Sequence, residues 1–218
     1  MKIFAFLFVL LLPLMASAGA YEDMEQAMIR RDASAVIDLL GRGMDINTVD
    51  RAGDTLLLQA VRTDMPELID YLIQRRARLN NRNRHGETAL SIAAFTGKMP
   101  YVQKLVEAGA ELNFYGWPPL SYAAFNGHAE VVDYLLKRGA EIDAKTQNGA
   151  TALYLAARNG HLEVVKLLLS KDADPMIVND NEESPVDAAM KSGNSDIEGL
   201  LRSAGGRSGK SVVLDLSK

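Results

Sequence analysis

Residues 148–175 read NGATALYLAARNGHLEVVKLLLSKDADP, and this stretch predicts two short helices joined by a turn. Thr151 can begin the first helix, because its hydroxyl accepts a hydrogen bond from a free N–H group of the first turn. The polar turn NGH at 159–161 interrupts the pattern, and VVKLLL at 164–169 then carries apolar residues at helical spacing. A helix pair of this size cannot bury its own apolar side, so we expect it to stack on neighbouring pairs.

The same pattern recurs along the chain with a period close to 33 residues. GDTLL begins at Gly53, GETAL at Gly86, GWPPL at Gly116 and GATAL at Gly149, so the steps are 33, 30 and 33 residues. The short step falls at NFYG, and we therefore expect one loop to lack three residues.

The quoted stretch and residues 116–144, GWPPLSYAAFNGHAEVVDYLLKRGAEIDA, resemble ankyrin repeats. The resemblance covers about residues 21–205 and implies an all-α solenoid of stacked helix pairs joined by β-turn or hairpin loops. This chain departs from the family at the His that follows Thr-Pro-Leu, so the hydrogen bonds that this His makes between repeats are not expected here. The replacements are Leu58, Ser91, Ser121, Tyr154 and Asp187.

The repeats divide most of the chain into six units. The predicted units are 21–49 as an N-terminal cap, 50–82, 83–115, 116–145, 146–178, and 179–205 as a C-terminal cap. Residues 206–218 are rich in Gly, Ser and Lys, which predicts a flexible tail.

The first twenty residues have the layout of a secretory signal peptide. A basic start, MK, precedes the apolar run IFAFLFVLLLPLM, and ASAGA then supplies small residues with cleavage sites after Ala18 and Ala20. The alternative is a membrane anchor, but the run is shorter than the roughly 20 residues that span a bilayer and contains Pro13. We therefore predict a cleavable signal peptide at 1–20, a periplasmic location and no membrane segment after cleavage.

Composition and spacing disfavour several kinds of chemistry. The chain has no cysteine, which excludes disulfides and zinc–thiolate sites, and its net charge of −4 disfavours nucleic acid. His128 and His161 occupy the same turn in successive units, too far apart to share a metal ion, and we expect them to bond nearby backbone. No cofactor or metal site is predicted.

Residues 204–211, AGGRSGKS, fit the looser phosphate-loop pattern. A phosphate loop needs a strand before it and a helix after it, so that N–H groups converge on phosphate. Here the helical segment DIEGLLRS comes before, and only VVLDLSK follows in the sequence. The match is therefore predicted to be accidental, and no nucleotide is expected to bind.

The remaining candidate for a functional site is the surface of the repeats. The resemblance implies that loop tips and the ends of first helices contact a protein partner, and we place the centre of the site on Phe95, Trp117 and Phe125. The alternative is that these rings fill gaps between helices and that Trp117 covers the neighbouring prolines. The predicted partner-binding residues are Phe95, Tyr115, Trp117, Phe125, Arg51, Arg62, Arg84, His85 and Arg158.

The sequence therefore predicts a non-catalytic, monomeric protein–protein interaction module of the exported bacterial type. Some exported bacterial ankyrins resemble helpers of oxidative-stress defence associated with catalase. The alternative function is an immunity or inhibitor protein that covers the active site of a periplasmic hydrolase toxin. An enzyme that uses the phosphate-loop-like tail or a histidine-bound metal is the least supported reading.

Overall fold

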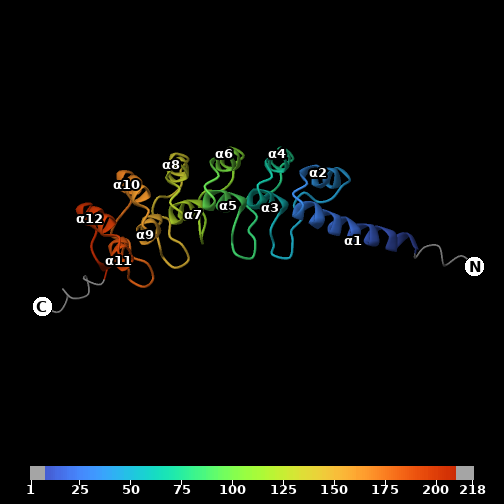
Figure 1. Ribbon diagram of the computed structural model, residues 1–218. Coiled ribbons are helices and arrows are strands. Elements are labelled where there is room, and N and C mark those ends of the chain that lie inside the picture. The colour runs from blue at the N-terminus through green and yellow to red at the C-terminus, as the bar shows by residue number, and fades with distance from the viewer. Residues whose placement is uncertain (1–7, 210–218) are drawn as a thin grey trace, which may run out of the picture. The chain divides into compact units, whose positions relative to one another are not determined.

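The computed structural model describes residues 8–209, which contain twelve helices and no strand. One isolated antiparallel bridge joins Val49 to Thr55 in a loop. The all-α prediction is confirmed (Figure 1). The chain divides into two compact units, Met1–Arg78 and Leu79–Lys218.

The first unit holds two helix pairs. They are α1 (Phe8–Ile29) with α2 (Ala33–Gly41), and α3 (Leu56–Thr63) with α4 (Pro66–Gln74). Helix α1 runs through both predicted cleavage sites, and no helix in residues 8–209 is long and apolar enough to cross a membrane.

The second unit holds four helix pairs in two layers. The pairs are α5 (Ala89–Phe95) with α6 (Met99–Glu107), α7 (Pro119–Phe125) with α8 (Ala129–Lys137), α9 (Ala152–Arg158) with α10 (Leu162–Ser170), and α11 (Pro185–Lys191) with α12 (Ser195–Ser203). First helices pack on first helices, α5 on α7, α7 on α9 and α9 on α11, and second helices follow in the same order. Each pair therefore completes its core with its neighbours.

The predicted helix caps are present. Thr55, Thr88 and Thr151 each accept a hydrogen bond from the N–H three residues later, at 3.1 to 3.3 Å. Ser184 forms a full capping box with Asp187. Helix α7 has no side-chain cap, and Pro118 and Pro119 set the backbone at its start instead.

Polar side chains in the turns connect successive pairs of the second unit. The Phe95 carbonyl oxygen accepts from Asn126 Nδ2 at 2.7 Å and lies 2.9 Å from His128 Nε2. Asn159 and His161 repeat this contact on the Phe125 carbonyl, both at 2.8 Å. Both histidines bond backbone as expected, but the carbonyl oxygen belongs to the preceding helix pair. They therefore couple neighbouring repeats, which lack the His that the family usually uses.

The last described residues differ from the expectation of a flexible tail. Gly206 is buried, and Ser208 and Gly209 donate hydrogen bonds to Asp187. Residues 210–218, which include the Lys and Ser of the phosphate-loop match and the VVLDL segment, lie outside the described residues.

Candidate partner-binding surface

In each repeat unit from 50–82 to 179–205, two residues eight positions apart lie at the two ends of the first helix. The earlier one directly precedes the helix cap. The later one is the last residue of the helix, or the residue before the last in α3. We call these two residues the tip pair of the unit. Two tip pairs are ion pairs, Asp54 with Arg62 in repeat unit 50–82 and Glu183 with Lys191 in repeat unit 179–205. In the other three units the pairs are Glu87 and Phe95, Trp117 and Phe125, and Ala150 and Arg158.

The Trp117 and Phe125 pair replaces charge with rings. Their ring centroids are 5.9 Å apart in an edge-on arrangement, and Tyr122 extends the contact, 5.2 Å from Trp117 and 5.9 Å from Phe95. These distances are favourable for aromatic pairs. We call Phe95, Tyr122, Trp117 and Phe125 the aromatic strip, which is continuous from α5 to α7.

Half of the aromatic strip also packs inside the molecule. Trp117 and Phe125 are partly buried against a cluster of Ala150, Tyr154, Leu155 and Ala188, whereas Phe95 remains 41% exposed. The rings of Trp117 and Phe125 therefore pack between first helices, whereas the Phe95 ring is exposed, and partner binding at these residues stays a prediction.

Tyr122 was not predicted for this surface. Its place in the repeat holds the buried apolar residues Ile92, Leu155 and Ala188 in other units, whereas Tyr122 is half-buried. Burial, with a smaller contribution from the Glu87 carboxylate, raises the pKa of Tyr122 to about 12. The phenol is therefore neutral at physiological pH.

The loop that lacks three residues is fixed by Arg82, which sequence reasoning also missed. The Arg82 guanidinium lies over the Phe114 ring, 4.1 Å from its centroid, and Nη1 donates to the Tyr115 carbonyl at 3.1 Å. The Tyr115 side chain is 79% exposed at the tip. Its ring is thus available to a partner while its backbone is held.

The predicted basic residues fall in separate places. Arg51 and Arg62 line an open cavity of about 660 Å³ in the first compact unit, together with Met24, Met28 and Ile29 of α1. Arg84 and His85 are exposed at the tip of a loop, and Arg158 is exposed at the end of α9. Arg158 has no carboxylate partner among the described residues.

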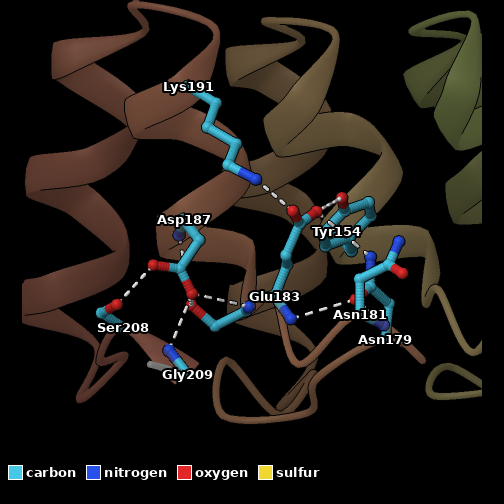
Figure 2. A network of polar contacts seen from close by, with 9 residues as sticks. Tyr154, Asn179, Asn181, Glu183, Asp187, Lys191, Ser208 and Gly209 are labelled. Carbon is cyan, nitrogen blue, oxygen red and sulfur yellow. Dashed lines mark hydrogen bonds and ion pairs between the residues drawn. The ribbon is translucent and has the colours of Figure 1, made fainter. Parts of the chain in front are cut away.

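A polar network links Tyr154 of α9 with Glu183 and with Lys191 of α11 (Figure 2). Tyr154 donates to Glu183 Oε2 at 2.7 Å, and Lys191 pairs with the other oxygen. The hydrogen bonds from Lys191 and Tyr154 lower the pKa of Glu183. Burial, and then the hydrogen bond to Glu183, raise the pKa of Tyr154 to about 12. Glu183 is therefore a fixed anion with a structural contact, which does not suit acid–base work.

No group of three or more metal-ligating side chains comes together in residues 8–209. The Nε2 atoms of His128 and His161 both face carbonyl oxygens.

The family model described as ankyrin repeats (3 copies) matches residues 24–115, 57–146 and 120–208. The chain belongs to the ankyrin-repeat family. Such repeats are generally protein–protein interaction modules, and ankyrin-repeat proteins are typically non-catalytic. The strip and tip pairs described above therefore lie on ankyrin repeats.

Two curated relatives share part of this ankyrin array. The mouse B-cell lymphoma 3 protein homolog is 36% identical over 78 residues, which are 35% of this chain and 17% of the relative. The rat nuclear factor NF-kappa-B p105 subunit is 31% identical over 90 residues, which are 40% of this chain and 9% of the relative. The aligned part is less than a fifth of either relative's length.

Proposed function

We propose that this ankyrin-repeat chain is a non-catalytic, monomeric binding module that holds a protein partner on the aromatic strip and on Tyr115. The observation that carries this proposal is the replacement of the tip ion pair by Trp117 and Phe125 beside an exposed Phe95. Unit 116–145 presents two rings where units 50–82 and 179–205 each present an ion pair.

The physical chemistry of the strip suits association. Aromatic side chains offer a large apolar area at low entropic cost, and truncation of an interface anchor typically costs about 2 kcal/mol or more. The tip ion pair of Glu183 and Lys191, in the next unit but one, supplies a polar rim. Arg84, His85 and Arg158 remain proposed outer contacts of this site, and Arg51 and Arg62 remain proposed contacts of the first compact unit.

The test uses residues whose removal leaves the core intact. The Phe95→Ala, Tyr115→Ala double variant should weaken capture of the partner by roughly thirtyfold or more, with a nearly unchanged thermal midpoint. Met176→Ala is the matched control, because Met176 is also 41% exposed and lies in a loop outside the strip. Undiminished capture by the double variant would contradict the proposed site.

Trp117→Ala is a less specific test of the site. Because the indole packs against Ala150, Tyr154, Leu155 and Ala188, its removal should lower the thermal midpoint as well as binding.

We also propose that residues 1–20 direct export to the bacterial periplasm and are then removed. The basic, apolar and small-residue layout supports this. N-terminal sequencing of the exported protein should begin at Gly19 or Tyr21, and a membrane-held product that begins at Met1 would contradict it.

The identity of a partner captured from periplasmic extract decides between the two physiological roles. A catalase would support a helper in oxidative-stress defence, whereas a secreted hydrolase would support an immunity protein.

A further inference from the structure

We propose that residues 206–209 form a strap that takes the place of a following repeat on the sixth unit. Ser208 Oγ donates to Asp187 Oδ1 at 2.5 Å, and the Gly209 N–H donates to Asp187 Oδ2 at 2.7 Å (Figure 2). The strap therefore binds both oxygens of one carboxylate on α11.

The repeat itself shows what normally contacts this position. Tyr154 is the equivalent residue 33 positions earlier, and its hydroxyl donates to Glu183 in the loop of the following unit. A second bond joins the same two units, from the Asp180 N–H to the Asn148 carbonyl. The position held by Tyr154 and Asp187 thus faces the next unit's loop, and at Asp187 the strap occupies that place.

The donors and acceptors are exchanged between the two junctions. At the first junction a phenol donates to a carboxylate of the following segment, whereas at the second a carboxylate accepts from the hydroxyl and N–H of the strap. Asp187 is buried, and Ser184 donates to its Oδ2 as well. A buried carboxylate needs such donors, and the strap supplies two of them.

Glycine is required at both ends of the strap. At Gly206 a Cβ atom would lie 2.8 Å from the Leu201 carbonyl oxygen and 3.0 Å from Val186 Cγ2. At Gly209 it would overlap the carbonyl oxygen of Glu182. Gly209, the glycine of the phosphate-loop match, is therefore accounted for by close packing beside the Asp187 carboxylate, which is the wrong charge for phosphate.

The test measures opening of the strap in the full chain. Trypsin cleaves after Arg207, which lies inside the strap, and Ser208 and Gly209 must leave Asp187 before the protease can bind this segment. Gly209→Ala and Ser208→Ala should each raise the cleavage rate after Arg207 by roughly tenfold or more, since hydrogen bonds to charged groups are among the stronger ones. Amide hydrogen exchange in α11 should rise with it.

Two substitutions in α12 are matched controls. Gly199→Ala places a methyl group where nothing lies within 4 Å, and Ser203→Ala removes a hydroxyl that bonds only its own helix. Both controls should leave cleavage after Arg207 and exchange in α11 unchanged. Wild-type cleavage and exchange in Gly209→Ala and Ser208→Ala would overturn the strap, as would equal increases in the controls.

Discussion

Asp143 carries a negative charge at a repeat position that holds a neutral asparagine in earlier units. Asn80 and Asn113 hold the same place in earlier units, and each accepts an N–H from the next unit, at 3.0 and 2.9 Å. The Asp143 carboxylate accepts the Asp174 N–H at 3.2 Å, but the Asp174 carboxylate is also near. Burial raises the pKa of Asp143, the Asp174 N–H opposes this, and the Asp174 charge adds to it.

Asp143→Asn should therefore stabilise the protein at neutral pH by about 0.5 kcal/mol, the scale of a partly exposed charge interaction. Since the folded-state pKa is the higher one, folding favours the protonated acid, and that stability is lost as the pH rises through the folded pKa. The gain from Asn should disappear at about pH 3, below the unfolded pKa. Urea unfolding at both pH values measures it, and a gain that persists in acid would contradict the electrostatic cause.

At the scale of elements, the turn between the two helices of a pair couples that pair to the next one. Gly97 has φ +68°, and a Cβ atom there would lie 2.5 Å from the His128 ring. Gly86 has φ +78° in a loop, with nothing within 4 Å of its Cβ position. An alanine at either position would have the same unfavourable left-handed backbone, but only at Gly97 would its Cβ atom also meet a side chain.

Gly86→Ala should cost about 1 kcal/mol of unfolding free energy, from the left-handed backbone alone. Gly97→Ala should cost about 1–2 kcal/mol more, because the His128 ring must move and lose its contact with the Phe95 carbonyl. Chemical denaturation of the two variants provides the comparison. Equal costs would mean that His128 does not couple the two pairs.

The helices and their caps were predictable because their signals are local. Thr55, Thr88 and Thr151 precede their helices directly, and the 33-residue period places the pairs. The contacts of Arg82 with Tyr115 and of Ser208 with Asp187 depend on residues 33 and 21 positions apart. Arg82 and Tyr115 hold the same position in successive repeats, but other units have Val49, Lys145 and Val178 there. The period alone therefore does not predict an arginine contact at this position, and Ser208 lies after the last repeat.

At the scale of the whole molecule, two of the seven tyrosines link folding to alkaline pH. Burial first, and then nearby Glu87 or Glu183, raises the pKa of Tyr122 and Tyr154 to about 12. In the unfolded chain both ionise near pH 10. The stability that they contribute is therefore complete below pH 10 and is lost as the pH rises towards 12.

Unfolding in this alkaline range should release up to about two protons from these groups. The thermal midpoint of the wild type should fall between pH 10 and 12 more steeply than that of the Tyr122→Phe, Tyr154→Phe double variant. Tyr115→Phe is the control, because the Tyr115 side chain is 79% exposed. Parallel pH profiles for the wild type and the double variant would contradict the linkage.

The turn asparagines that join the repeats also bear on chemical ageing. Asn126 and Asn159 each precede a glycine, a sequence in which the side-chain amide can cyclise onto the next backbone nitrogen and lose ammonia. In the folded chain both amides donate to a carbonyl oxygen, and the Gly127 and Gly160 N–H groups are bonded as well. Deamidation there would place a carboxylate against a carbonyl oxygen and remove the donor. Each transient opening of the stack thus exposes these two asparagines to permanent damage, and the rigidity of the turns protects them.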